Sequence, residues 1–167
     1  MSISNSLIIL GQLSDMDVEW LIDNGSNLKI EQGHELITQN TPISTLFVTL
    51  KGQFNIIADN DIKARVGAGE ILGEMSFIDA NPPSATVTAA ENAIVHSIPK
   101  DLLQEKLKND DSFAARFYKA IATLLSDRLR TANANNDDEA EELDLEVLDK
   151  VHLAGQRFDA MVKRFID

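Results

Sequence analysis

Short runs of β-forming residues follow one another along residues 27–98, and this pattern restricts the fold more than any other feature of the sequence. The runs are Leu28–Ile30, Glu35–Thr38, Leu46–Leu50, Phe54–Ala58, Ile62–Val66, Ala85–Ala89 and Ala93–Ile98. Gly52 and Gly67 lie between runs, and Asp59-Asn60-Asp61 is a hairpin signal. Many short strands with regular turn residues are typical of sandwiches and barrels. We therefore predict a mainly β fold with flanking helices, closed as an antiparallel jelly-roll-like β-roll.

A helix is predicted before the β-rich region, within the first ~25 residues. Ser14 is placed as its N-cap, and Asp15 and Asp17 follow in the first turn, where acidic groups favour the helix dipole. Asn24-Gly25 ends the helix, since both residues tolerate the left-handed conformation of a C-terminal cap.

Two further helices are predicted after Pro99, which ends the last strand. The first covers Lys100–Lys108, with Leu102, Leu103 and Leu107 facing inward. The second begins at Asp110-Asp111-Ser112 and is expected to end near Arg130. Its apolar residues recur at spacings of three and four, which predicts one buried stripe. They are Phe113, Phe117, Ile121, Leu124 or Leu125, and Leu129.

The C-terminal region differs in composition from the rest of the chain. We predict a domain over residues 1–132, an acidic solvated linker over 133–142 and an amphipathic helix over 143–167. The apolar seam of this helix comprises Leu148, Val151, Gly155, Phe158, Val162 and Phe165. A short amphipathic helix needs a surface to cover its apolar side. That surface is either its own domain, a second subunit in a homodimer, or a protein partner.

Charge and cysteine content exclude several classes of protein. The chain has 15 Lys and Arg against 27 Asp and Glu, and its net charge of −12 repels nucleic acids. It has no cysteine, so disulfide scaffolds and thiolate zinc sites are ruled out. The N-terminus lacks the basic start of a signal peptide, and no apolar stretch reaches the ~18 residues of a membrane span. We expect a cytoplasmic protein that binds neither DNA nor membranes.

Residues 69–87, GEILGEMSFIDANPPSATV, carry the main chemical signal. A strand is predicted to end at Leu72, Gly73 permits a tight turn, and Met75–Asp79 form a short helix. The N-terminus of such a helix presents unpaired backbone N–H groups to an anion. Ser84 opens the next strand with its hydroxyl available, and Glu74 can accept a hydrogen bond from a sugar hydroxyl.

This segment resembles the phosphate-binding cassette of the cyclic nucleotide-binding domain family, and the resemblance covers about residues 10–132. The resemblance implies the family fold, a β-roll flanked by helices. It also implies a sensor or adaptor whose ligand is cyclic AMP or cyclic GMP. The implied ligand-binding residues begin with Gly73 and Glu74 at the ribose 2′-hydroxyl, and with Ser84 and Ala85 at the cyclic phosphate. The others are Ile71 and Leu72 as pocket walls, Met75 and Ser76 in the cassette helix, and Thr131 and Asn133 near the base.

The sequence departs from the family at Pro83, where the resemblance implies an arginine that pairs with the phosphate. Loss of one such charge-assisted contact costs ~1.5–3 kcal/mol, or about ten- to a hundredfold in affinity. Arg65 is a candidate substitute. The alternative hypothesis is an interaction module that works without a ligand and has a degenerate pocket.

Other interpretations of the site residues stay open at this point. Glu74 is also compatible with a surface carboxylate, Ser84 with a strand-edge hydroxyl, and Met75 and Phe77 with core packing. The three histidines lack metal-binding spacing, and no acid, base and nucleophile converge in a recognisable motif. We therefore predict that the chain is not an enzyme and holds no metal.

Overall fold

The computed structural model describes residues 5–134 together with 156, 159, 162 and 163. The chain divides into two compact units, Trp20–Glu105 and the pair Met1–Glu19 and Lys106–Asp167. The first two residues of the predicted linker 133–142 are helical, and its remainder, 135–142, lies outside the described residues, as does most of the predicted C-terminal helix. Its four described residues are helical.

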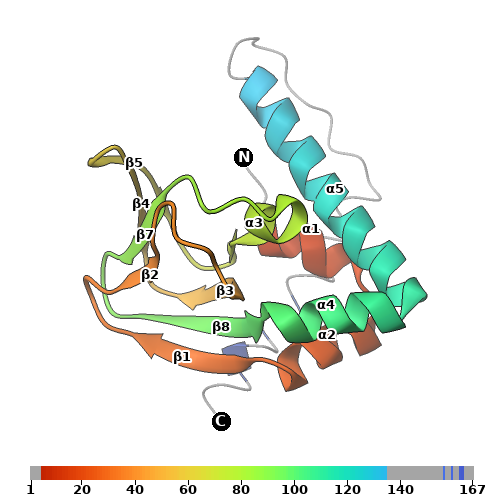
Figure 1. Ribbon diagram of the computed structural model, residues 1–167. Coiled ribbons are helices and arrows are strands. Elements are labelled where there is room, and N and C mark those ends of the chain that lie inside the picture. Colours follow the sequence, from red (N-terminus) through yellow and green to blue (C-terminus); the bar gives the residue numbers. More distant parts are fainter. Residues whose placement is uncertain (1–4, 135–155, 157–158, 160–161, 164–167) are drawn as a thin grey trace. The chain divides into compact units, whose positions relative to one another are not determined.

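The unit Trp20–Glu105 is built on two four-stranded antiparallel sheets, which confirms the predicted jelly-roll class (Figure 1). Sheet A has the order β1-β8-β3-β6, and sheet B has the order β2-β7-β4-β5. The strands are β1 Ser26–Ile30, β2 Glu35–Ile37, β3 Thr45–Lys51, β4 Phe54–Ala58, β5 Asp61–Val66, β6 Ile71–Leu72, β7 Thr86–Ala89 and β8 Ala93–Pro99. Apart from β4 and β5, which pair in sheet B, strands that follow each other in the chain lie in different sheets, as in a roll.

The hydrophobic core of this unit lies between the two sheets. Sheet A contributes Ile30, Phe47, Ala93 and Val95, and sheet B contributes Ile37, Phe54, Val87 and Ala89. Strand residues alternate between the two faces of a sheet, so every second position of β4 and β7 points into this core. The positions between them point to the outer face of sheet B.

The turns follow the sequence signals closely. Asp59 and Asn60 both have positive φ, 53° and 66°, which is the conformation of a tight hairpin between β4 and β5. Strand β8 ends at Pro99, as predicted. Strand β7 begins at Thr86 rather than at Ser84, so the prediction that Ser84 opens this strand is wrong.

Helices α1, Asn5–Gln12, and α5, Asp111–Ala134, pack against each other in the other unit. The predicted N-cap is confirmed at α2, Asp15–Asp23. The Ser14 N–H donates to Asp17 Oδ2 at 2.8 Å, and the Asp17 N–H donates to Ser14 Oγ at 3.2 Å. This reciprocal pair is a capping box, which satisfies two backbone donors at the start of the helix.

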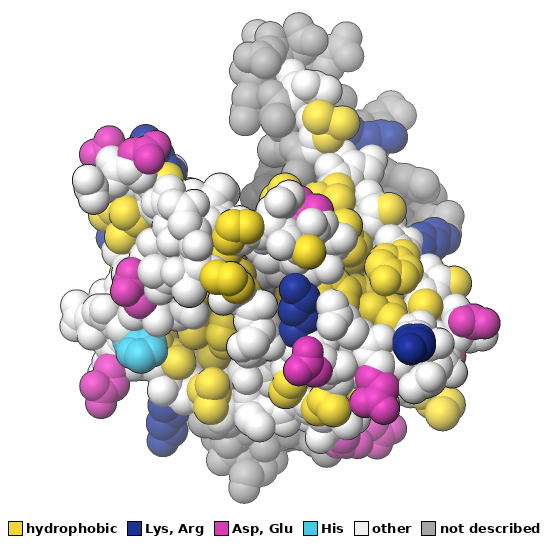
Figure 2. All heavy atoms as spheres, viewed as in Figure 1, with side chains coloured by type: hydrophobic (Ala, Val, Ile, Leu, Met, Phe, Trp, Pro, Cys, Tyr) yellow, Lys and Arg dark blue, Asp and Glu magenta, His cyan; other side chains and the backbone are white. Residues whose placement is uncertain are grey.

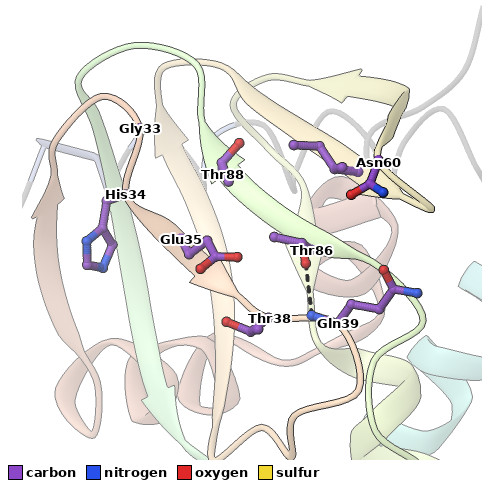
Figure 3. Close-up of a pocket in the computed structure, with 9 residues that line it drawn as sticks. Gly33, His34, Glu35, Thr38, Gln39, Asn60, Thr86 and Thr88 are labelled. Atoms are coloured by element: carbon purple, nitrogen blue, oxygen red, sulfur yellow. Dashed lines mark hydrogen bonds between the residues drawn. The ribbon is translucent and has the colours of Figure 1, made fainter.

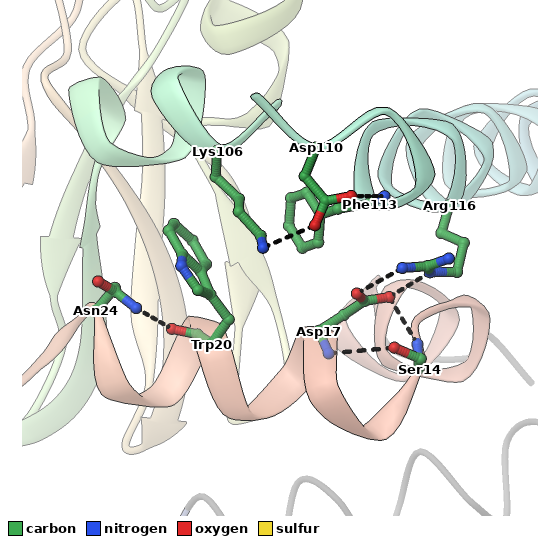
Figure 4. Close-up of polar contacts among 8 residues, drawn as sticks. All are labelled: Ser14, Asp17, Trp20, Asn24, Lys106, Asp110, Phe113 and Arg116. Carbon is green, nitrogen blue, oxygen red and sulfur yellow. Dashed lines mark hydrogen bonds and ion pairs between the residues drawn. The ribbon is translucent and has the colours of Figure 1, made fainter. Parts of the chain in front are cut away.

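Asp17 also joins two helices that are distant in sequence. Arg116 on α5 donates to both carboxylate oxygens, Nε to Oδ2 at 2.6 Å and a terminal nitrogen to Oδ1 at 2.9 Å (Figure 4). Burial of Asp17 opposes its ionisation, but the hydrogen bonds from Arg116 and Ser14 outweigh that cost. The pKa of the Asp17 carboxyl is therefore below its ordinary value of 3.8.

The helices after the roll are longer than predicted, and part of their stripe is exposed. Helix α4 covers Lys100–Asn109, and the Asp110 carboxylate accepts the Phe113 N–H at the start of α5. Leu103 and Leu107 are buried, but Leu102 is 40% exposed, so its inward prediction is wrong. Leu124 is buried in preference to Leu125, and Leu129 is 64% exposed. Helix α5 continues to Ala134 instead of ending near Arg130, because no proline or glycine interrupts it.

Candidate functional site

The cassette begins at β6, which is attached to β3 in sheet A. Leu72 pairs with Phe47, and Ile71 pairs with Val48. Thr49 fastens the loop before β6: its hydroxyl donates to the Gly67 carbonyl and accepts the Glu70 N–H, both at 2.8 Å. Thr49 is fully buried, so these bonds form in a site without competing water. The backbone that leads into the cassette is therefore held at a defined position.

Gly73 forms the turn between β6 and the cassette helix α3, Glu74–Asp79. Its φ of 95° lies in the left-handed region, and a Cβ there would lie 3.2 Å from the Thr45 carbonyl oxygen. Glycine is required at this position for both reasons. The sequence prediction of a tight turn at Gly73 followed by a short helix is confirmed.

Two polar residues of α3 are buried. Glu74 is 6% exposed and Ser76 is 8% exposed, while Met75 between them is 58% exposed. The interpretation of Glu74 as a surface carboxylate is thus wrong, and so is the interpretation of Met75 as core. Lys100 Nζ donates to the Ser76 carbonyl at 3.4 Å, and the Ala80 N–H donates to the same oxygen at 3.1 Å. These bonds hold the end of the helix, where backbone carbonyls lack helical partners.

The return segment, residues 81–85, is held by the loop that follows β2. The Asn40 N–H donates to the Pro83 carbonyl at 2.9 Å, and the Gln39 N–H donates to Thr86 Oγ1 at 2.9 Å. Ser84 is exposed, and Ala85 is half-buried. Within the part of the chain that the structure describes, the N–H groups of Ser84 and Ala85 donate no hydrogen bond to a protein acceptor. Two adjacent donors are therefore available to an anion.

Arg65 does not supply the missing guanidinium. Its Nε donates to Asn55 Oδ1 at 3.0 Å, and Asn55 and Arg65 are opposite each other in the β4–β5 ladder. Phe54 and Val66, one position away, point into the core, so Arg65 lies on the outer face of sheet B. The candidate substitution by Arg65 is wrong. Nor does the return segment itself, residues 81–85, contain a basic residue.

The predicted ligand-binding residues are divided between the two units of the chain. One continuous segment of the unit Trp20–Glu105 contains most of them, namely Ile71, Leu72, Gly73, Glu74, Ser76, Pro83, Ser84 and Ala85. Thr131 and Asn133 lie in the last turn of α5, in the other unit, and Asn133 is exposed. The side chain of Thr131 lies outside the described part of the chain. The assignment of these two residues to the base stays a prediction.

Sequence reasoning missed the residues that support the cassette from outside it. Four residues outside the cassette hydrogen-bond to it or to the loop before it: Thr49, Gln39, Asn40 and Lys100. Gln39 and Asn40 do so through their backbone N–H groups, and Lys100 through a flexible side chain. Backbone bonds leave no residue-type signature. Only Thr49, a hydroxyl residue within an apolar run, carried a signal that could have been noticed.

Charge around the site is diffuse. On the face drawn in Figure 2, Lys and Arg side chains are scattered among acidic ones and do not gather into a patch. The described residues contain no group of three or more His, Asp or Glu that could hold a metal ion. None of the described helices has the length and apolar composition needed to cross a membrane.

The comparison with known families matches this geometry. The family model for the cyclic nucleotide-binding domain matches residues 27–110, which include the whole cassette and both sheets except Ser26. The chain belongs to the cyclic nucleotide-binding domain family. The solved cyclic nucleotide-binding domain from Methylobacillus flagellatus is similar, with a TM-score of 0.69, 26% identity and coverage of 84% of this chain and 85% of that one. The Thermus thermophilus catabolite activator protein has the same fold, with a TM-score of 0.65 at 16% identity, over 95% of this chain and 86% of that one.

Two curated relatives contain a similar region within longer chains. The cGMP-dependent protein kinase of Eimeria tenella is 26% identical over 108 residues, which are 64% of this chain and 11% of the kinase. The Pycsar effector protein BcPycTIR of Burkholderia cepacia is 25% identical over 118 residues, 70% of this chain and 39% of the effector. The chain thus spans less than half of either relative. The similarity concerns the cyclic nucleotide-binding domain, whose coarse function is regulatory ligand binding.

Proposed function

We propose that the cassette binds the ribose and cyclic phosphate of a cyclic nucleotide, such as cyclic AMP or cyclic GMP, and that the chain is a cytoplasmic sensor or adaptor. One observation carries this proposal: the cassette holds a buried carboxylate at one end and two available backbone donors at the other. Glu74 is 6% exposed beside the left-handed Gly73. The N–H groups of Ser84 and Ala85 donate to no acceptor within the described residues.

The two ends suit the two polar parts of the ligand. Glu74 would accept a hydrogen bond from the ribose 2′-hydroxyl, and its burial would strengthen that bond by excluding water. The N–H groups of Ser84 and Ala85 and the Ser84 hydroxyl would donate to the phosphate oxygens. Ile71 and Leu72 would line the apolar wall. Without a guanidinium at position 83, affinity would be about ten- to a hundredfold below that of a cassette that has one.

Signalling requires that the ligand binds one arrangement of the helices more tightly than another. We propose that binding in the cassette shifts the helices after Pro99, and that residues 143–167 then engage a protein partner or a second copy of the chain. The size of the shift is limited by the difference in ligand affinity between the two arrangements. The segments 1–132, 133–142 and 143–167 are the proposed domain, linker and output helix.

A second function is favoured by Pro83 and by the exposure of Ser84. In this alternative, the roll is a scaffold that works without a ligand, and residues 143–167 form the functional surface. Proline removes one backbone donor and one cation from the phosphate position at the same time.

Replacing Pro83 by arginine separates the two functions. Affinities for cyclic AMP, GMP, CMP and UMP would be measured by calorimetry and by thermal stabilisation for the natural chain and for Pro83→Arg. The matched control is Pro82→Arg, which adds the same charge one residue earlier at an exposed position. We expect about ten- to a hundredfold tighter binding in Pro83→Arg and little change in Pro82→Arg. A folded Pro83→Arg variant that binds none of the four ligands would establish the scaffold function instead.

A further inference from the structure

A polar hollow lies on the outer face of sheet B, next to the return segment of the cassette, and its lining includes Gln39 and Thr86, which were described above. Its volume is about 780 Å³, and it is open to solvent. Thr86, Thr88 and Ile57 line it, whereas Val87, Ala89 and Phe54, which alternate with them along β7 and β4, point into the core. The other lining residues are Gly33, His34, Glu35, Thr38, Gln39 and Asn60.

The side chains around this hollow have unused hydrogen-bonding capacity. The side chains of His34, Glu35, Thr38, Asn60 and Thr88 form no hydrogen bond or ion pair with another described residue. Figure 3 shows Glu35 on β2 and Thr86 and Thr88 on the neighbouring β7, with Thr38 just after β2 and with Gln39 and Asn60 at one side of the hollow. Hydroxyl and amide groups each offer donors and acceptors, so the lining can match a ligand that offers both.

Charge decides which class of ligand this lining suits. No Lys or Arg lines the hollow, and Glu35 is its one carboxylate. Glu35 is opposite Thr88, Thr88 is opposite Asn55, and Asn55 is opposite Arg65, so a single row crosses the sheet. Arg65 ends that row and already donates to Asn55. A phosphate or carboxylate would meet Glu35 without a facing cation, whereas a neutral molecule carries no such penalty.

The walls of the hollow are held by backbone contacts. The Gly33 N–H donates to the Ala89 carbonyl at 2.8 Å, and the Ala89 N–H donates to the His34 carbonyl at 3.0 Å. The Gln39 N–H donates to Thr86 Oγ1 at 2.9 Å, and Asn60 lies in the tight β4–β5 turn. The backbone of the lining residues is therefore fixed before a ligand binds, so binding does not have to order these strands and turns.

We propose that this hollow binds a neutral saccharide of one or two rings. Glu35 accepts hydrogen bonds from ring hydroxyls, and the hydroxyls of Thr88 and Thr38 and the amides of Gln39 and Asn60 bond to others. Ile57 contacts the C–H face of a ring. The volume falls within the range of roughly 300–1,000 Å³ that is common for small-molecule sites. The proposal is independent of cyclic nucleotide binding, and its test uses no nucleotide.

The test is an NMR titration of the full chain, labelled with ¹⁵N, with glucose, galactose, maltose, cellobiose and lactose. Each is added to about 50 mM, because a few neutral hydrogen bonds give millimolar affinity. At least one saccharide should shift the amide signals of Glu35, Thr38, Asn60 and Thr88 along a saturating curve. Thr88→Val keeps the side-chain shape and should weaken binding about fivefold. Glu35→Gln should weaken it about tenfold, since it removes a charged acceptor.

The matched control is Glu91→Gln, which removes an exposed carboxylate outside the hollow and should leave the affinity unchanged. Both hollow variants change exposed or half-buried positions, and amide spectra verify that they remain folded. The proposal is overturned if no saccharide gives saturating shifts. It is also overturned if the shifts map elsewhere, or if Thr88→Val and Glu35→Gln bind as well as the natural chain.

Discussion

Asp17 and Glu74 are the two buried carboxylates among the described residues, and their surroundings differ. Asp17 is 4% exposed and receives two hydrogen bonds from Arg116 and one from Ser14. Glu74 is 6% exposed and lies in the cassette, at the start of α3. A buried charge has a large desolvation cost, so each carboxylate needs a compensating role. Asp17 therefore stabilises the helices through Arg116 and Ser14, whereas a ligand role is proposed for Glu74.

The largest expected effect is on stability at Asp17. Asp17→Asn keeps the side-chain shape but removes the charge that Arg116 binds, and we expect a loss of about 2–3 kcal/mol in the free energy of unfolding. Urea denaturation measures this loss. Asp15→Asn is the matched control, because Asp15 is exposed in the same first turn of α2 and should change stability by less than about 1 kcal/mol. Equal losses in the two variants would contradict a specific role for Asp17.

The contribution of Asp17 depends on pH with a definite sign. The folded-state pKa of its carboxyl is below the ordinary value of 3.8, so the folded state favours the ionised form. This stabilisation is present in full above the unfolded-state pKa and is lost as the pH falls through the folded-state pKa. The natural chain should therefore lose more stability than Asp17→Asn between about pH 5 and pH 2. Parallel acid unfolding curves would contradict a stabilising role for the ionised Asp17 carboxylate.

The second effect concerns ligand affinity at Glu74. In the Pro83→Arg background, Glu74→Gln should weaken cyclic nucleotide binding about ten- to a hundredfold, because a neutral amide replaces a charged acceptor. Calorimetry measures this change, and Glu105→Gln, at an exposed position on α4, is the control. If Glu74→Gln destabilised the fold as much as Asp17→Asn and left ligand affinity unchanged, both carboxylates would be structural.

The smallest expected effect is on stability at Gly73, in the turn between β6 and α3. Gly73→Ala places a Cβ 3.2 Å from the Thr45 carbonyl at a φ of 95°, and should cost about 1–2 kcal/mol of stability. Gly33→Ala is a matched control, because Gly33 has a similar φ of 85° but nothing lies within 4 Å of the added Cβ. The difference between the two variants, measured by urea denaturation, isolates the contact with Thr45. No difference would show that this contact has no influence.

Local sequence patterns predicted the helices, strands and turns well, but they predicted less well which residues of a helix are buried. The strand pattern, the Ser14 cap and the turns at Gly73 and Asp59-Asn60 depend on residues close in sequence, and the structure contains them all. A period of 3.6 residues did not choose between Leu124 and Leu125, because both lie near the same helical face. The structure buries Leu124 and leaves Leu129 exposed, since burial depends on which element covers each turn of the helix.

In the candidate site too, features that depend on consecutive residues were predicted, and features that depend on strand pairing were not. The cassette residues from Ile71 to Ala85 were found because they are consecutive, and the position of Pro83 was visible in the sequence itself. The outward direction of Arg65 was not, because it depends on the register between β4 and β5. A shift of that register by one residue would turn Arg65 toward the core.

The amino-acid sequence alone determined the succession of short strands, the cassette turn and the absence of a guanidinium at position 83, since each follows from neighbouring residues. Only the tertiary structure determined that Asp17 meets Arg116, 99 residues away, and that Asn40 and Gln39 support the return segment of the cassette. It also brought β2, β4 and β7 together around the outer hollow. These contacts join distant segments through hydrogen bonds, and hydrogen-bonding groups are common to so many residues that no local pattern identifies the pairs.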